Sequence, residues 1–166
     1  IAIQFGAMLA VVVLYWKKFL TGADIWKRVF IAFLPTAIVG FLLYKTLKTY
    51  LLGNAMLVVW ALAIGGAALI VFEIWQKKSI YYKNESFQNC SIQEISYKKS
   101  FLVGLAQALA IIPGVSRSGA TIIGGLLMGI DRQAIVEFSF LLAVPTMAAA
   151  TAYDLYKSAG SFTFGE

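Results

Sequence analysis

A single arginine, Arg117, lies in a long stretch of the chain that is otherwise uncharged. From residue 100 to residue 130 no other Asp, Glu, Lys or Arg occurs. The neighbours that offer a hydroxyl group or permit a close backbone approach are Gly114, Ser116, Ser118, Gly119 and Thr121. Arginine binds phosphate oxygens through two parallel hydrogen bonds, and a helix starting near Gly119 would add the positive end of its dipole. The pattern predicts an anion site, most naturally for phosphate, but no P-loop, because the Gly-Lys pair is absent.

Composition places this arginine in a membrane. The chain is 60% hydrophobic and 13% charged, whereas about a quarter of the residues in a soluble domain are charged. A charge near the bilayer centre costs at least about 2.5 to 3.5 kcal/mol on insertion scales, so it should face a cavity or a partner. A snorkelling arginine is the alternative, but Arg117 is remote from the flanking charges at Lys99 and Asp131. We therefore expect a functional site.

Four uncharged runs are candidates for membrane-spanning helices, because each approaches the roughly 17 to 25 residues that a crossing needs. They are residues 1–16, 29–44, 55–72 and 138–153. Pro35 and Pro145 lie within two of these runs and predict kinks. The predicted fold class is an all-α integral membrane protein, a polytopic helical bundle. Residues 1–166 form one partial membrane domain, since the chain starts inside an apolar run and looks cut at both ends.

A re-entrant hairpin is predicted for residues 100–130. The polar segment 76–100 is expected to be a surface loop that becomes helical late, because Ser91 and Glu94 fit a capping box. The next helix should end before Pro113, and a second should run from near Gly119 to about Met128. Residues 100–112 and 119–130 would each be only about 18 to 20 Å long, too short for roughly 30 Å of hydrocarbon.

The distribution of basic residues predicts the topology. If the hairpin returns to its side of entry, one face collects Lys17, Lys18, Lys27, Arg28, Lys77, Lys78, Lys83, Lys98, Lys99 and Arg132. The other face keeps Lys45, Lys48 and Lys157, so the richer face should be cytoplasmic. These residues flank apolar runs, so the net charge of +6 indicates topology rather than nucleic-acid binding. One cysteine and no histidine exclude a disulfide framework, a cysteine metal site and imidazole chemistry within this chain.

Two segments are similar enough to indicate an internal repeat. Residues 4–11, QFGAMLAV, align with residues 137–144, EFSFLLAV. In the predicted topology the two helices run in opposite directions, which is typical of an inverted repeat. The repeat predicts a second hairpin upstream of Ile1.

The residues around Arg117 resemble a known family. The segments LAQALAIIPGVSRSGATIIGGLLMGI and EFSFLLAVP resemble the BacA-type undecaprenyl-diphosphate phosphatases of bacteria. The family signature Pro-Gly-x-Ser-Arg-Ser-Gly stands at residues 113–119, and the opening IQFGAMLAVVVLYW is similar to the helix after the family's first motif. The resemblance implies two re-entrant hairpins meeting inside the membrane. It also implies removal of the terminal phosphate from undecaprenyl diphosphate, which recycles the lipid carrier for peptidoglycan and confers bacitracin resistance.

The resemblance also implies residue roles. Catalysis or phosphate binding falls to Ser116, Arg117 and Thr121, and substrate contacts fall to Gly114, Ser118, Gly119 and Gln107. It further implies a polyprenyl diphosphate substrate, the bacterial plasma membrane, a homodimer, and a divalent cation, Mg or Ca. That cation should be held mainly by a first motif with paired glutamates, which this chain lacks, so we expect the fragment alone to be inactive. Glu137 is interpreted as an acid near a helix N-terminus, with a catalytic role as the alternative.

Two other functions are open at this point. A transporter or channel for anions or lipid phosphates also combines inverted repeats, broken helices and a mid-membrane arginine. A paired-glutamate hairpin encoded upstream of Ile1 would favour the phosphatase. A different class of lipid phosphatase requires His and Asp where this chain has Ile123 and Leu127, which argues against it.

Overall fold

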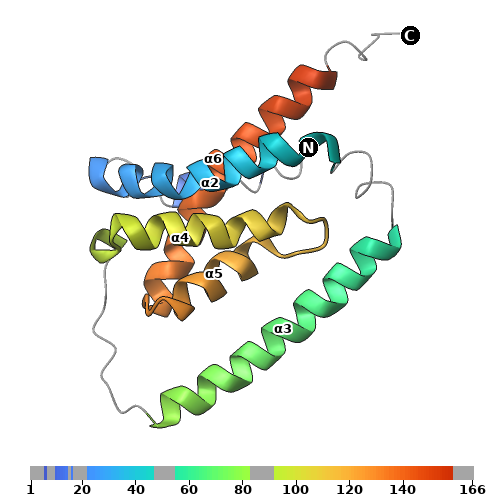
Figure 1. Ribbon diagram of the computed structural model, residues 1–166. Coiled ribbons are helices and arrows are strands. Elements are labelled where there is room, and N and C mark those ends of the chain that lie inside the picture. The colour runs from blue at the N-terminus through green and yellow to red at the C-terminus, as the bar shows by residue number, and fades with distance from the viewer. Residues whose placement is uncertain are drawn as a thin grey trace.

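The computed structural model describes residues 6, 10–14, 16, 22–46, 55–82 and 92–158. Its elements are α2 (Ala23–Thr46), α3 (Ala55–Tyr82), the 3-10 turn η2 (Ile92–Glu94), α4 (Tyr97–Ala108), the 3-10 turn η3 (Leu109–Ile111), α5 (Arg117–Leu127) and α6 (Arg132–Ser158) (Figure 1). No strand occurs within these described ranges. The all-α fold class is therefore confirmed.

Three helices are long and apolar enough to cross a bilayer: Ala23–Leu43, Ala55–Gln76 and Arg132–Tyr153. They confirm three of the four predicted spans, and the fourth, residues 1–16, lies largely outside the described residues. α2 and α6 begin before the apolar runs at residues 29 and 138. The residues before these runs include charged side chains, which helix ends tolerate at the membrane surface. Asp24 and Lys27, for example, are about two-thirds exposed. Both helices continue through their prolines.

The predicted polar loop, residues 76–100, is wrong at its start, because α3 continues past Gln76 to Tyr82. α4 begins at Tyr97, which agrees with the expectation that the segment becomes helical late. The capping box is also wrong, because the N-cap of α4 is Ser96, whose side chain accepts a hydrogen bond from the Lys99 amide at 3.3 Å. Ile92 and Ile95 are buried in the core, so packing fixes a separate turn ahead of the helix. Residues 83–91 lie outside the described residues.

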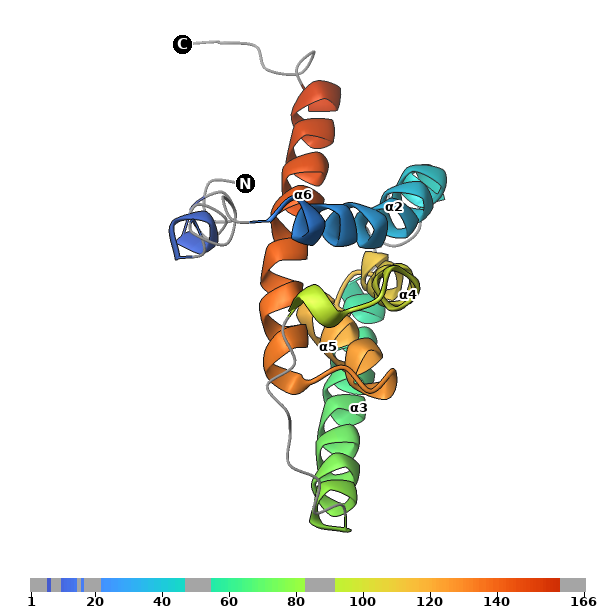
Figure 2. The ribbon, with the colours of Figure 1, turned by 90° about the vertical axis from the view of Figure 1, so that its left-hand side faces the viewer.

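α4 and α5 form a hairpin that packs against α2 and α6, and Figure 2 shows both arms on the same side of α6. Glycines, which have no side chain, permit the close approach of α4 to α2 and of the two arms to each other. A methyl group at Gly104 would overlap the Ala32 carbonyl of α2, and one at Gly124 would overlap Ala106 of α4. Small residues at helix interfaces have the same effect in membrane bundles generally. The expected helical hairpin is present, with arms of 12 and 11 residues, each too short to cross a bilayer. Its re-entrant placement in the membrane stays a prediction.

Both ends of the hairpin lie at one end of the bundle. Ile92 and Ile95, before α4, share a core cluster with Ile130 and Ala134, after α5. The N-terminus of α2 joins them, because Arg28 Nε donates to the Ile95 carbonyl oxygen at 2.6 Å. In Figure 1 the turn that joins α4 to α5 lies at the opposite end of the hairpin. This arrangement agrees with a hairpin that returns to its side of entry.

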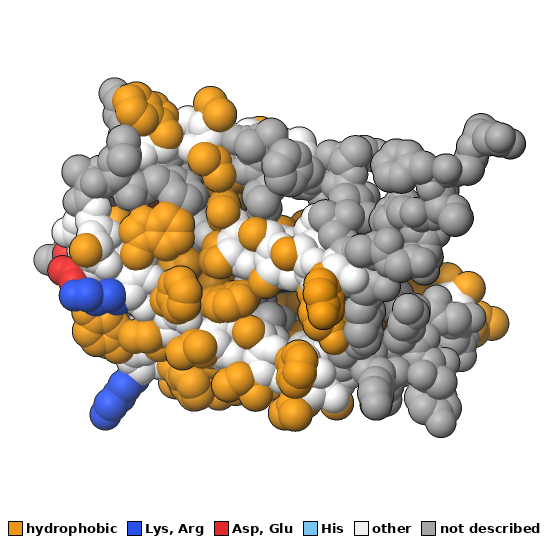
Figure 3. Space-filling view, turned by 90° about the horizontal axis from the view of Figure 1, so that it is seen from above, with side chains coloured by type: hydrophobic (Ala, Val, Ile, Leu, Met, Phe, Trp, Pro, Cys, Tyr) orange, Lys and Arg blue, Asp and Glu red, His pale blue; other side chains and the backbone are white. Residues whose placement is uncertain are grey.

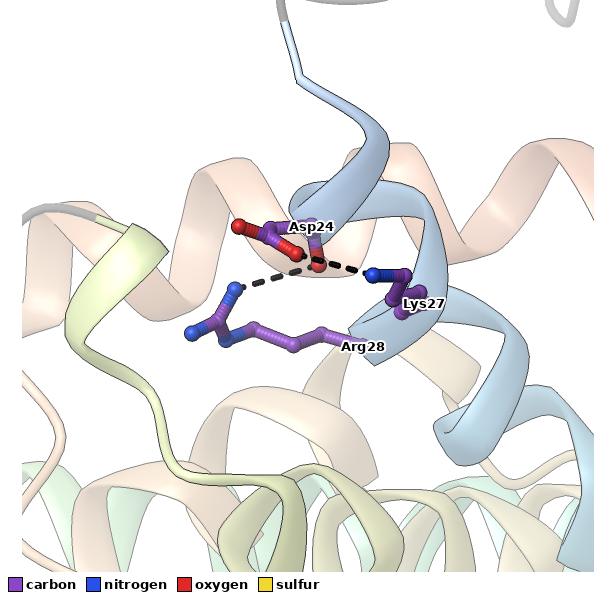
Figure 4. Close-up of polar contacts among 3 residues, drawn as sticks. All are labelled: Asp24, Lys27 and Arg28. Atoms are coloured by element: carbon purple, nitrogen blue, oxygen red, sulfur yellow. Dashed lines mark hydrogen bonds and ion pairs between the residues drawn. The ribbon is translucent and has the colours of Figure 1, made fainter.

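Charged side chains gather at this end of the molecule. Figure 3 shows basic side chains (blue) and an acidic one (red) at one end of the face it draws, with apolar side chains over much of the remaining described surface. In Figure 4 Lys27 Nζ lies 3.3 Å from a carboxylate oxygen of Asp24, and Arg28 Nη1 donates to the Asp24 carbonyl oxygen at 3.1 Å. The Arg28 guanidinium also lies 5.0 Å from the centre of the Tyr97 ring. We interpret this end as the membrane surface.

α3 runs along the hairpin from its turn to its base. The Val58 carbonyl and the Ala61 side chain lie against Gly114 at the turn. At the base, Arg132 donates to both carboxylate oxygens of Glu73 at 3.1 and 2.9 Å. Between these two points most of α3 is exposed, and none of its spanning segment is buried.

Candidate anion site at the hairpin turn

The turn between α4 and α5 is built on Gly114. The Val115 amide donates to the Ile112 carbonyl at 3.1 Å, and Gly114 takes a φ of +96°. This left-handed backbone favours glycine, because a side chain there meets its own carbonyl. A Cβ atom would also lie 2.7 Å from the Val58 carbonyl oxygen. Gly114 therefore shapes the turn and lets α3 approach it, and its role in substrate binding stays a prediction.

α5 begins at Arg117, two positions before the Gly119 expected from the sequence. Its N-cap is Ser116, whose hydroxyl oxygen accepts a hydrogen bond from the Gly119 amide at 3.2 Å. The Ser116 and Ser118 side chains are exposed, and their oxygens lie 3.4 Å apart. Among the described residues, the amides of residues 116 to 118 have no hydrogen-bond acceptor. These free donors and the helix dipole make the end of α5 attractive to an anion.

The half-buried Arg117 side chain reaches from α5 to α6. Its Nη1 donates to Thr146 Oγ1 at 2.8 Å and to the Ala143 carbonyl oxygen at 3.2 Å. Within the described residues its Nε and Nη2 atoms make no hydrogen bond. They are not among the buried polar atoms that lack a partner, so both are accessible. These two nitrogens carry the parallel N–H groups of one edge of the guanidinium plane. That edge is free to bind a phosphate through two hydrogen bonds.

Gln107 and Thr121 lie inside the bundle rather than at the exposed turn, with 1% and 0% of their surfaces accessible. Thr121 Oγ1 donates to the Arg117 carbonyl oxygen at 2.7 Å and lies 3.5 Å from Gln107 Oε1. Gln107 Nε2 donates to Thr36 Oγ1 at 3.2 Å, and Thr36 donates to the Gly104 carbonyl oxygen at 3.0 Å. This polar chain, Gly104–Thr36–Gln107–Thr121, ties α2 and α4 to the first turn of α5.

The structure thus divides the predicted site residues into two groups. At the turn lie Gly114, Ser116, Arg117, Ser118 and Gly119. Thr121 and Gln107 support the turn from inside. The roles of all seven residues in catalysis, phosphate binding or substrate binding stay predictions. The sequence does not predict Thr36 or Thr146. Their only signal is a hydroxyl within an apolar run, and such hydroxyls often bond across membrane helices.

Acidic residues do not cluster in the part of the chain that the structure describes, which holds no group of three His, Cys, Asp or Glu side chains suited to a metal ion. Glu137 lies in the second turn of α6 and is half-buried. This position agrees with its interpretation as an acid near a helix N-terminus. The divalent cation stays a prediction.

Comparison with known proteins identifies the family. A sequence model described as "Bacitracin resistance protein BacA" matches residues 1–165. The chain belongs to the BacA family. Relatives named undecaprenyl-diphosphatase include those of Aquifex aeolicus and of a Sulfurihydrogenibium species, each 51% identical over all 166 residues. That of Persephonella marina is 52% identical over 158 residues, which cover 95% of this chain and 59% of the relative.

Membership of the BacA family confirms the resemblance inferred from residues 113–119 and places the chain among membrane proteins. The chain spans 62% of the length of the Aquifex and Sulfurihydrogenibium relatives. The first copy of the predicted inverted repeat, residues 4–11, lies largely outside the described residues. The inverted repeat therefore stays a prediction.

Proposed function

We propose that the complete gene product hydrolyses undecaprenyl diphosphate to undecaprenyl phosphate and inorganic phosphate. The observation that carries the proposal is the free Nε–Nη2 edge of Arg117 beside the unpaired amides of α5. The names of the relatives supply the substrate, since proteins about half identical to this chain are called undecaprenyl-diphosphatase.

The site suits phosphoryl transfer, in which catalysis depends mainly on positioning and on stabilising the charge of the transferred group. Arg117 binds two oxygens of the terminal phosphate through its free edge. The exposed hydroxyls of Ser116 and Ser118 and the N-terminus of α5 provide further donors. Water adds across the P–O–P linkage: its oxygen ends on the released phosphate, and the bridging oxygen stays with the lipid phosphate.

The apolar surface around the turn suits a polyprenyl substrate. Large apolar side chains of the hairpin and of α3 are exposed, including Leu109, Ile112 and Val59. They would contact the prenyl chain while the diphosphate reaches Arg117, so the headgroup reacts without leaving the membrane. We place the protein as a multi-pass protein of the bacterial plasma membrane, with the charged end of the bundle in the cytoplasm.

The proposed function also includes the membrane face on which the site opens and the recycling of the lipid carrier. The turn lies opposite the charged end, so the site opens toward the outer face, and the released lipid phosphate is recycled as the carrier for peptidoglycan synthesis. An excess of the enzyme confers bacitracin resistance, in keeping with the family description. A divalent cation, held mainly by residues outside those described, and a homodimer complete the proposal.

Substitution of Arg117 by lysine tests the proposed function. Lysine keeps the charge but loses the planar edge that donates two parallel hydrogen bonds. Removing one preorganised donor typically lowers turnover by ~10²- to 10³-fold. We expect a loss of this size in Arg117→Lys when phosphate release from undecaprenyl diphosphate is measured with the purified gene product in detergent. The melting temperature should stay close to that of the wild type.

A matched control is Lys99→Arg, at the charged end of the bundle, which should leave phosphate release unchanged. Turnover near the wild-type value in Arg117→Lys would contradict the phosphate-clamp role. If the wild-type protein moves lipid diphosphate across vesicle membranes but releases no phosphate, the protein is a transporter and the phosphatase assignment is wrong.

A further inference from the structure

Thr146 of α6 contacts the arginine of the proposed site directly. Arg117 Nη1 lies 2.8 Å from Thr146 Oγ1, the shorter of its two hydrogen bonds. The same hydroxyl lies 2.8 Å from the Leu142 carbonyl oxygen and 3.0 Å from the Ala143 carbonyl oxygen of its own helix. One threonine therefore joins the arginine to the backbone of α6.

The hydrogen-bond pattern determines the direction of each bond. A hydroxyl has one proton and two lone pairs. The α6 carbonyls can only accept, so the Thr146 proton points to them and a lone pair is left for Arg117. Threonine is branched at Cβ and has few rotamers in a helix, which keeps its oxygen in place. Thr146 thus presents a fixed acceptor to the long arginine side chain.

Fixing Nη1 also fixes the rest of the guanidinium. The group is planar and rigid, so two bonds at Nη1, to Thr146 and to Ala143, set the direction of the whole plane. The Nε–Nη2 edge then points away from these acceptors and stays available. Without the hydroxyl, Arg117 would keep a single bond of 3.2 Å to the Ala143 carbonyl, and its side-chain torsions could turn the free edge away from a bound phosphate.

We infer that Thr146 is a positioning residue, which holds Arg117 so that its Nε–Nη2 edge meets the phosphate of the substrate. The inference rests on the proposed function, because it gives Thr146 an effect on catalysis only through Arg117. A structural role alone would stabilise the contact between α5 and α6 without affecting turnover.

The test compares two substitutions at position 146 in the complete gene product. Thr146→Val keeps the shape but removes the acceptor, and a misplacement of about 1 Å can lower the rate ~10²-fold. We expect phosphate release from undecaprenyl diphosphate to fall about 10- to 100-fold in kcat/KM. Thr146→Ser keeps the hydroxyl and should stay within about threefold of the wild type.

Two controls separate positioning from general damage. Thr151→Val makes the same chemical change on the same helix and should be as active as the wild type. In an Arg117→Lys background, Thr146→Val should cause no further loss, because residues that act through one another are not additive. Independent, multiplying losses would overturn the inference, and so would a fully active Thr146→Val.

Binding distinguishes failure of the inference from failure of the proposed function. The probe is the methylene-bridged diphosphonate analogue of the lipid, which cannot be hydrolysed at the bridge. Weaker binding in Thr146→Val than in Thr146→Ser supports the inference even if hydrolysis is absent, and equal binding with equal turnover overturns it. A wild-type protein that neither binds this probe nor releases phosphate overturns the proposed function and the inference together.

Discussion

Substitution of Gly114 by alanine should damage the hairpin turn through two separate costs. The φ of +96° lies in the left-handed region, where a Cβ atom costs about 1 to 2 kcal/mol. The same Cβ would lie 2.7 Å from the Val58 carbonyl oxygen and 3.0 Å from the Ala61 side chain. Forcing an extra carbon into a packed contact costs about 1 to 3 kcal/mol more. The expected loss of unfolding free energy is therefore about 2 to 5 kcal/mol.

Gly129 provides a matched control for the first of these costs. It also has a positive φ, +68°, but a Cβ there would meet nothing within 4 Å. Gly129→Ala should therefore lose only about 1 to 2 kcal/mol. The difference between the two variants measures how closely α3 packs on the turn, and it should be about 1 to 3 kcal/mol.

The assay is thermal unfolding of both variants in one detergent, together with phosphate release. Gly114→Ala should also lower turnover, because the turn carries Arg117 and must shift to relieve the overlap with Val58. Gly129→Ala, at the far end of α5, should keep turnover near the wild-type value. Equal stability in the two variants would refute the packing of α3 on Gly114.

Two further predictions concern topology and the buried polar chain. Cysteines placed at Lys99 and Arg132 should react alike with an impermeant thiol reagent in intact cells, and opposite labelling would mean that residues 100–130 cross the bilayer. Thr36→Val removes bonds to Gln107 and to the Gly104 carbonyl, and should destabilise the protein by about 1 kcal/mol, since hydrogen bonds between membrane helices average ~0.6. Thr36→Ser should restore the melting temperature. An unchanged melting temperature in Thr36→Val would contradict a stabilising role for the buried polar chain of hydrogen bonds.

Local sequence features predict the elements well. The lengths of the apolar runs depend only on the thickness of the bilayer, so three spans follow from counting residues. The hairpin is predicted by two helix-breaking residues, since Pro113 and Gly114 interrupt an apolar stretch that is otherwise helical. Arg117 stands out because a charge is costly inside a membrane.

Helix boundaries and the hydrogen-bond partners of side chains are harder to predict, because tertiary contacts decide them. α3 continues past Gln76 although the sequence there becomes polar, since a helix can extend beyond the hydrocarbon. Ser96 caps α4 because buried Ile95 and Ile92 fix the preceding turn. Hydroxyls inside apolar runs are visible in the sequence, but which of them meets Arg117 depends on how α5 packs on α6.

The contacts of Arg117 explain how one residue can be stable in the membrane and still be available to bind phosphate. Insertion of a charge costs at least about 2.5 to 3.5 kcal/mol, while a hydrogen bond to a charged group contributes about 1.5 to 3 kcal/mol. The two bonds from Nη1 to α6 are therefore of the size needed to hold the side chain in place without a ligand.

The remaining edge of the guanidinium can then bind phosphate without breaking the bonds to α6. Lysine cannot divide its donors in this way, because all three N–H groups leave one nitrogen and its stem is flexible. An ammonium at position 117 must therefore compromise between Thr146 and the substrate. The proposed function consequently predicts a loss of turnover, rather than a loss of folding, when Arg117 becomes lysine.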